Sequence, residues 1–197
     1  TGAYVGTGLL SPETAALVGG LGIAFGVLTY SRPVMETVGK GIVPLDPFSA
    51  LVVVLSEGLT LHIFTQVGVP VSSSQAVVGA VAAQAAFTRR FGARAALYGA
   101  VGGALADADV LIRSAADPLL AVEMHRHFTH SLAFVPLGGV LAALPFLVRR
   151  GGREHWRAIV AACTLGYATH APLDILTSYG TLWLWPFSRE RLELDWM

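Results

Sequence analysis

The sequence has little charge, almost no lysine and a single cysteine. Of its 197 residues only 13% are Asp, Glu, Lys or Arg, about half of the roughly 25% typical of soluble domains. Thirteen basic and thirteen acidic side chains cancel, so the basic footprint of a nucleic-acid-binding protein is missing. The lone Cys163 excludes an internal disulfide and a cysteine-based metal site. Since 54% of the residues are hydrophobic, the composition also excludes disorder and indicates a chain whose main solvent is lipid.

Long uncharged runs recur along the chain. About 20 apolar residues cross the hydrocarbon core of a bilayer, within a working range near 17–25. We therefore predict an all-α, polytopic integral membrane protein with about six apolar helices, one of them broken near Pro70. The predicted segments are residues 14–31, 47–67, 69–88, 95–106, 131–148 and 158–173.

Arginine clusters orient these segments. The first cluster follows the third segment and the second follows the fifth; they comprise Arg89, Arg90 and Arg94, then Arg149, Arg150, Arg153 and Arg157. Both clusters are predicted to be cytoplasmic by the positive-inside rule. Two segments then cross between them, which leaves the loop 107–130 on the opposite face, where segment 158–173 also ends. We expect a prokaryotic plasma (inner) membrane protein whose partners are the bilayer and a phosphate-containing small molecule, without nucleic acid. Homo-oligomerisation is left open.

Histidines and aspartates collect on that opposite face. They occur in the motifs DAD, HRHFTH and HAPLD and comprise Asp107, Asp109, His125, His127, His130, His170 and Asp174. The spacing of four places His170 and Asp174 on one helix face, although Pro172 between them is expected to distort the turn. Imidazole and carboxylate together suit Zn²⁺, Mn²⁺ or Fe²⁺. The pattern predicts a divalent metal that activates a water molecule as nucleophile.

The ligand-type residues cannot all bind one ion, so roles are divided by position. The predicted metal ligands lie at the ends of apolar segments and are Asp107, His130, His170 and Asp174. The predicted catalytic residues are Asp109, His125 and His127. The same three residues are also candidates for orienting the metal ligands or contacting the substrate. Arg126 either holds an anionic substrate group such as phosphate or snorkels to lipid headgroups. Taken singly, DAD is also compatible with a solvated turn, and HRHFTH with a basic interfacial patch.

The second part of the chain resembles a known family. The resemblance rests on GALADADVLIRS, HRHFTHSL, GYATHAPLDILTSYGT and LWPFS and spans about residues 75–196. These motifs are similar to those of the LexA-regulated, membrane-bound metal-dependent hydrolases. The resemblance implies a hydrolase of undefined substrate, a phosphoester or a lipid-linked ester being the candidates, and it implies that Gln75 belongs to the substrate site. Members of that family continue further, so we expect a C-terminally truncated domain over residues 79–197.

The first part carries another pattern. METVGKGIVPLDP, an apolar helix and then GVPVSSSQAVVGA resemble one repeat of the inorganic phosphate transporter (PiT) family of cation-coupled symporters. The resemblance implies that residues 1–78 are a partial repeat in which Ser72, Ser73 and Ser74 bind phosphate. An ordinary serine N-cap is the alternative. Such transporters need two inverted repeats, so phosphate symport is the second functional hypothesis, and a chimeric fragment with neither activity is the third.

Overall fold

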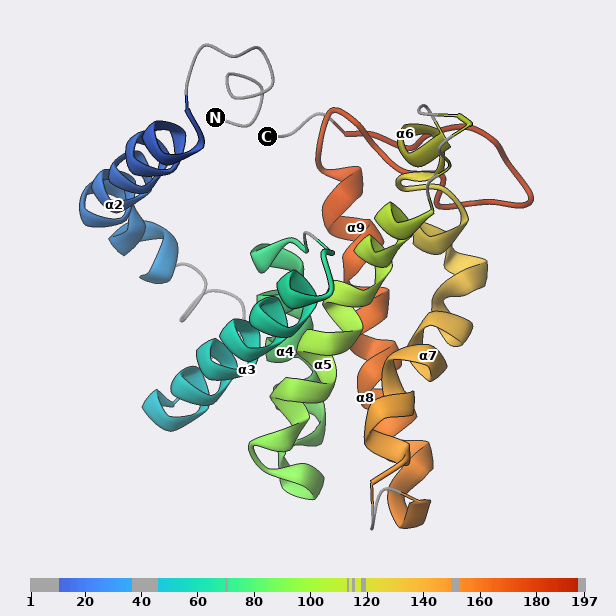
Figure 1. Ribbon diagram of the computed structural model, residues 1–197. Helices are drawn as coiled ribbons and strands as arrows, with labels where there is room; N and C mark the ends of the chain where they lie inside the picture. Colours follow the sequence, from blue (N-terminus) through green and yellow to red (C-terminus); the bar gives the residue numbers. More distant parts are fainter. Residues whose placement is uncertain are drawn as a thin grey trace. The chain divides into compact units, whose positions relative to one another are not determined.

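The computed structural model describes residues 11–36, 46–69, 71–112, 114, 116–117, 120–149 and 153–194 (Figure 1). In these ranges every named element is a helix, and the β pairing given is one isolated antiparallel bridge between Thr181 and Leu192. The predicted all-α class is confirmed. The chain divides into two compact units, Thr1–Leu45 and Asp46–Met197.

Each predicted apolar segment coincides with one of the longer helices. The first unit contains α2 (Pro12–Glu36). The second contains α3 (Pro47–Gln66), α4 (Ser73–Phe91), α5 (Arg94–Leu105), α7 (Val135–Leu147) and α8 (Trp156–Ala168). Shorter pieces are α6 (Leu120–Met124), α9 (His170–Ile175) and the 3₁₀ helices η2 (Ala106–Leu111), η3 (Phe128–His130), η4 (Leu132–Phe134) and η5 (Arg153–His155). Pro70 lies outside the described residues, but α3 and α4 are separate helices on either side of it.

Local sequence explains where α3 begins and where α4 ends. Asp46 is the N-cap of α3, because its carboxylate accepts the backbone N–H groups of Phe48 and Ser49 at 3.0 and 3.1 Å, and Pro47 follows it in the first turn. Helix α4 ends at Gly92, whose φ of 55° is readily adopted by glycine. The chain then turns back directly into α5.

Glycines let α4, α5 and α8 pack backbone against backbone. A Cβ atom at Gly99 of α5 would collide with the backbone of Gly79 on α4, and one at Gly166 of α8 would collide with Gly99. One turn further along α5, Gly103 lies equally close to the backbone of Gln75. Small residues allow this approach between membrane helices. The packing brings the first turn of α4 beside the last turn of α5.

One helix among the described residues is both long and apolar enough to cross a bilayer, namely Pro47–Gln66, by its length and composition. Shorter apolar helical stretches are Glu13–Gly26 and Leu132–Leu147. Large apolar side chains on α3 and α7 are exposed, among them Leu55, Leu59, Leu137 and Leu144. These exposed rows are compatible with contact to lipid, and the crossing of the membrane by six segments stays a prediction.

Within the second unit, the two ends of the bundle differ. The α4–α5 turn and the segment between α7 and α8 lie at one end, whereas η2, α6 and α9 lie at the other (Figure 1). Arg89, Arg90 and Arg149 are exposed at the first end; Arg150 and the side chain of Arg153 lie outside the described part. Arg126, Arg189 and Arg191 lie at the other end, where Arg126 pairs with Asp174 and Arg191 donates to the His125 carbonyl. The predicted separation of arginines from the histidine and aspartate motifs is therefore only partial in this unit.

Candidate metal centre

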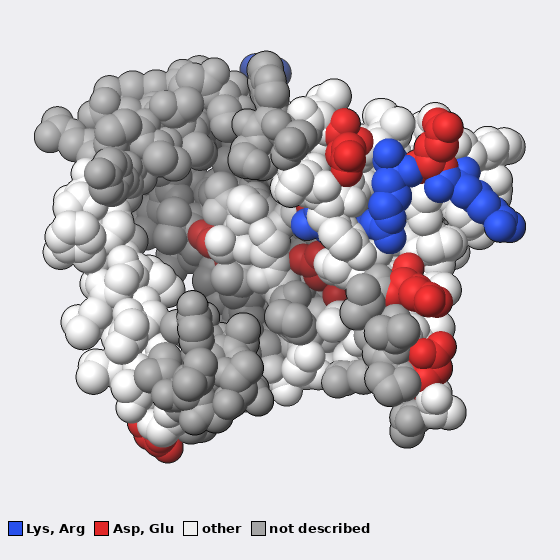
Figure 2. All heavy atoms as spheres, turned by 90° about the horizontal axis from the view of Figure 1, so that it is seen from above, with Lys and Arg blue, Asp and Glu red and all other residues white. Residues whose placement is uncertain are grey.

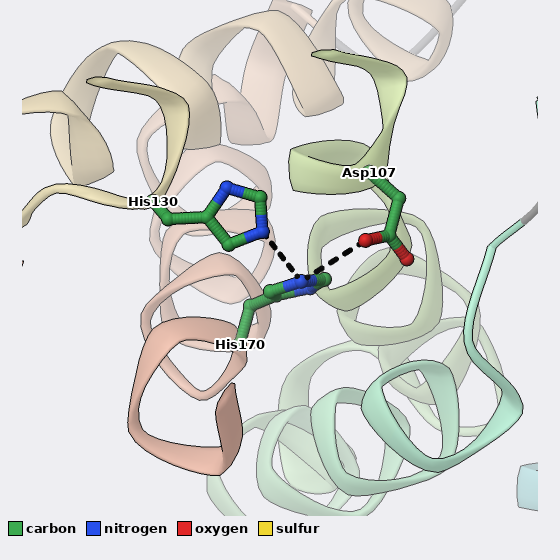
Figure 3. Close-up of side chains that lie close together, drawn as sticks. All are labelled: Asp107, His130 and His170. Atoms are coloured by element: carbon green, nitrogen blue, oxygen red, sulfur yellow. Dashed lines mark hydrogen bonds and ion pairs between the residues drawn. The ribbon is translucent and has the colours of Figure 1, made fainter. Parts of the chain in front are cut away.

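The buried side chains of Asp107, His130 and His170 converge where α5 runs into η2 and α8 runs into α9 (Figure 3), and the buried Asp174 adjoins the two histidines. The Nε2 atoms of His130 and His170 are 3.0 Å apart. Asp107 Oδ1 lies 3.3 Å from His170 Nε2. Asp174 Oδ2 lies 3.2 Å from His130 Nε2 and 3.3 Å from His170 Nε2. These are the residues that the sequence predicts as metal ligands, and the structure brings all of them together.

Irregular helix ends aim these side chains at one another. Asp107 lies in η2, the 3₁₀ turn that ends α5, and His130 lies in η3. Thr169 interrupts the helix between α8 and α9, so Pro172 falls in the first turn of α9, where a proline costs no hydrogen bond. His170 and Asp174 thus keep their i, i+4 relation on one face of α9 despite the proline.

Hydrogen bonds fix which imidazole nitrogens carry protons. Nδ1 of His170 is bonded to the carbonyl of Gly103, and because a carbonyl only accepts, this nitrogen is the donor. The Thr129 hydroxyl donates to Asp109 Oδ2 at 3.2 Å, so its oxygen accepts the Nδ1 proton of His130 at 2.9 Å. In both neutral rings Nε2 therefore holds a lone pair.

Two lone pairs that face each other at 3.0 Å, with carboxylate oxygens on either side, repel unless positive charge lies between them. A proton on one imidazole or a metal cation supplies that charge. Asp174 Oδ2 is buried and lacks a hydrogen-bond partner, which is costly for an acceptor in the interior. Two imidazole and two carboxylate donors in this arrangement suit a divalent transition metal, so the donor set fits the predicted ion.

A third carboxylate, that of Asp109, holds this cluster in place from outside. Asp109 accepts hydrogen bonds from His125 Nδ1 at 3.1 Å and from the backbone N–H of Arg126 at 2.9 Å. Burial alone would raise the pKa of Asp109, but these two hydrogen bonds outweigh it and hold the pKa below its usual range. The hydrogen bond between His125 and Asp109 also raises the pKa of His125. Asp109, linked to His130 through Thr129, is therefore an anion that orients a histidine ligand.

Arg126 and Gln75 both contact the outer oxygen of Asp174. Arg126 Nη2 lies 3.2 Å from Asp174 Oδ1, and its Nη1 donates to the Thr177 hydroxyl at 2.7 Å. Gln75 Nε2 donates to the same Oδ1 at 2.7 Å. Arg126 has a φ of 57°, a left-handed conformation that is uncommon for a residue with a side chain. That backbone turn aims its N–H group at Asp109 and its guanidinium at Asp174.

The serine run lies at the edge of the same centre. The backbone N–H of Ser72 donates to Asp107 Oδ2 at 3.0 Å. Ser72 occupies the N-cap position of α4 but makes no side-chain cap hydrogen bond; its hydroxyl pairs instead with Ser74 at 2.8 Å. Ser73 and Ser74 are exposed. The residues of both predicted sites are thus neighbours in space.

His127 points to other surroundings. Its ring centroid lies 5.8 Å from that of Trp185 and 6.1 Å from that of Phe128. Burial lowers the pKa of His127, and the charges of Arg191 and Arg189 lower it further. This side chain packs in the aromatic loop beyond η3, whereas His125 and His130 turn toward Asp109.

Residues that sequence reasoning missed complete the network. Thr129 relays His130 to Asp109, Thr177 holds Arg126, and the Gly103 carbonyl fixes His170. The threonines stand inside or directly after the histidine and aspartate motifs, which is the signal that could have found them.

Seen from this end, charged side chains gather on the side where α6 and the C-terminal loop lie, with uncharged surface around them (Figure 2).

Two family models match the chain. The model described as YdjM inner membrane protein matches residues 71–197, and the model of the phosphate transporter family matches residues 3–106. Both resemblances noted from the sequence motifs are confirmed, since the first model describes the LexA-regulated, metal-dependent hydrolases. The two matches overlap over residues 71–106, the region of α4 and α5.

The similar curated proteins are phosphate transporters. Sodium-dependent phosphate transporter 1-B of Xenopus laevis is 36% identical over 77 residues, 39% of this chain and 11% of that protein. Sodium-dependent phosphate transporter 1 of Homo sapiens is 34% identical over the same shares. A putative phosphate permease of Pyrococcus furiosus is 43% identical over 70 residues, 36% of this chain and 17% of that protein. The chain spans a small part of these relatives, and no solved structure matches it.

Proposed function

Because the chain belongs to the YdjM inner membrane protein family over residues 71–197 and to the phosphate transporter family over residues 3–106, we propose that it is a membrane-embedded metal-dependent hydrolase. It is an integral membrane protein, and its substrate in this proposal is a phosphoester or a lipid-linked ester. We place the hydrolase domain at residues 79–197 and the transporter-like segment at residues 1–78.

One observation carries the proposal. The Nε2 atoms of His130 and His170 face each other at 3.0 Å, beside a buried Asp174 oxygen for which no hydrogen-bond donor is assigned. In a buried site, this geometry is costly without a cation and favourable with one. The ligands in this proposal are Asp107, His130, His170 and Asp174.

The remaining residues prepare the site for hydrolysis. When bound, a divalent cation lowers the pKa of a water molecule toward neutrality and so supplies the nucleophile. Asp109, through Thr129, keeps the His130 imidazole in the ligating tautomer. Arg126, braced by Thr177, presents its guanidinium to an anionic group of the substrate. His125, part-exposed at the edge of the site, is placed to transfer a proton to the leaving group.

Metal analysis tests the ligand set. The detergent-purified protein is expected to carry close to stoichiometric zinc, manganese or iron. Changing both His170 and Asp174 to Ala removes two of the ligands and should reduce bound metal several-fold, with loss of phosphoester hydrolysis. His62→Ala, an exposed histidine on α3, is the control and should keep both. Unchanged metal content in the double variant would contradict the proposal.

Cation-coupled phosphate symport is the second candidate function. It is supported by the phosphate transporter family match and by Ser72–Ser74, which lie at the start of α4 without making the ordinary side-chain cap. The N–H groups at a helix start are suited to an oxyanion. Phosphate binding here would displace the Asp107 carboxylate from the Ser72 N–H group and the hydroxyl pair of Ser72 and Ser74. Transport by this segment would require an oligomer or a partner, because the site of such transporters is built from two repeats.

Uptake into proteoliposomes separates the two functions. Symport predicts sodium-dependent phosphate uptake that is lost in Ser73→Ala and kept in Ser49→Ala, a serine of the first turn of α3. Hydrolysis predicts no uptake in either variant or in the wild type. The absence of uptake under any imposed gradient would leave residues 1–78 without a transport role.

A further inference from the structure

An apolar groove of about 450 Å³ lies between α3, α5 and α7. Its walls include Ile63, Val101 and Phe146, and its polar lining residues are Thr60 and Arg149. The Thr60 hydroxyl is already bonded to the Ser56 carbonyl, so the walls offer a ligand mainly hydrocarbon contact. Ile63 is 48% exposed, which shows that the groove is open along the side of the bundle.

The groove leads toward the metal centre. A smaller cavity of about 240 Å³, called here the inner cavity, is lined by Asp109, Thr129 and Tyr167. Leu105 of α5 and Leu141 of α7 line both the groove and the inner cavity. The two spaces are therefore adjacent, with this leucine pair between them, and Asp109 lines the inner cavity on the far side of the pair.

We propose that the groove binds the hydrocarbon chain of an amphiphilic substrate whose polar head reaches the metal centre. The inference rests on the proposed hydrolase function and names its substrate class, an ester of an acyl or isoprenoid lipid. The two volumes together fall within the range of about 300–1,000 Å³ typical of ligand sites. In this proposal the chain lies in the groove and passes the leucine pair, which places the head beside Asp109 and Thr129 of the inner cavity.

The direction of the groove agrees with this substrate. Helix α7 has 13 residues and is therefore about 20 Å long at 1.5 Å per residue. Leu141 and Arg149 both line the groove, so it follows the last two turns of α7 away from the metal centre. A lipid with its head at that face of a membrane extends its chain in the same direction. A water-soluble phosphoester would use the inner cavity and leave the groove unused.

Binding of two alkyl phosphates of different chain length tests this inference without relying on turnover. Hexadecyl phosphate and butyl phosphate are titrated into the metal-loaded protein in detergent, and retention is measured by native mass spectrometry. Leu141→Trp fills the junction between the two spaces. We expect it to bind hexadecyl phosphate at least 10-fold more weakly than the wild type, with butyl phosphate binding unchanged.

Two further variants separate a blocked groove from a damaged fold. Leu137→Trp adds the same ring to an exposed position on α7 that lines neither space, and Leu141→Ala opens the junction. Both should bind hexadecyl phosphate as the wild type does. If the wild type and Leu141→Trp bind hexadecyl phosphate equally well, the probe binds only as lipid around the protein, and the inference is overturned. Equal loss of hexadecyl and butyl phosphate binding in Leu141→Trp would also overturn it. Chain-dependent binding without hydrolysis of any ester would instead overturn the proposed hydrolase function and leave the groove assignment standing.

Discussion

Asp109 lies outside the candidate metal centre but is connected to it by hydrogen bonds. Its carboxylate collects hydrogen bonds from His125, the Arg126 backbone and Thr129, and through Thr129 it fixes the proton on the far side of His130. A metal-binding imidazole needs a defined tautomer, and the acceptor behind it provides that definition. The order of the network thus depends on a carboxylate that does not face the ligand atoms.

Asp109→Asn should weaken metal binding by about 10–100-fold, since an amide is a poorer acceptor and no longer stabilises a charged cluster. Competition with a chelating dye measures the dissociation constant. Asp46→Asn makes the same chemical change at the exposed N-cap of α3, where asparagine caps as well as aspartate, and should leave affinity unchanged. If the two variants bind metal equally well, Asp109 does not orient the ligand.

Among the helices, α4, α5 and α8 depend on glycine for their spacing. Gly99 stands between Gly79 of α4 and Gly166 of α8 and has no room for a Cβ atom. Gly103 then presents its carbonyl to His170. The close packing of these helices is therefore also what positions a metal ligand, and stability and site geometry are linked.

Gly99→Ala should destabilise the protein by about 1–3 kcal/mol, because overpacking pushes the backbones apart. Thermal unfolding in detergent would show a lower Tm and, in the same variant, weaker metal binding. Gly58→Ala on α3 is the matched control, since nothing lies within 4 Å of its added carbon and alanine favours the helix. A Tm for Gly99→Ala equal to that of the control would rule out tight contact at this position.

At the scale of the whole molecule, the charge distribution predicts how the second unit sits in a membrane. Arg89, Arg90 and Arg149 are exposed at one end of this bundle, whereas the candidate metal centre lies at the other, together with Arg126, Arg189 and Arg191. The positive-inside rule then places the metal centre on the non-cytoplasmic face. Substrate would reach it from that face or, for a lipid, from the bilayer along the groove.

Cysteine labelling tests this orientation, and the native chain suits it because its one cysteine, Cys163, is buried. Glu190→Cys and Arg149→Cys each replace an exposed residue at opposite ends. In right-side-out vesicles an impermeant maleimide should label the cysteine at 190 directly, and the one at 149 only after permeabilisation. Labelling of both from the same side would refute the topology.

Uncharged run length was sufficient to predict the helices. The six segments read from the sequence overlap α2, α3, α4, α5, α7 and α8, with boundaries that differ by several residues, because apolar runs bounded by charge or glycine have few other structures available in lipid. Because successive segments were expected to cross the membrane in opposite directions, the sequence also predicted that one end of the bundle carries Asp107, His130, His170 and Asp174. The motifs predicted the two families, and the matches confirmed both.

Only the tertiary structure decided which side chains lie within a few ångströms of one another. Local spacing says nothing about a hydrogen bond from Ser72 to Asp107 or from Gln75 to Asp174, across 35 and 99 residues. The first contact depends on how closely α4 approaches the end of α5, which glycines on both helices set together, and the second on how α9 packs against α4. The left-handed turn at Arg126 likewise separates His125 from His127 in a motif whose histidines look alike. The sparse charge determined that the protein belongs in a membrane, and the motifs predicted which end carries the histidines and aspartates. Helix packing determined which of these residues contact one another, because contacts between distant segments depend on packing rather than on spacing along the chain.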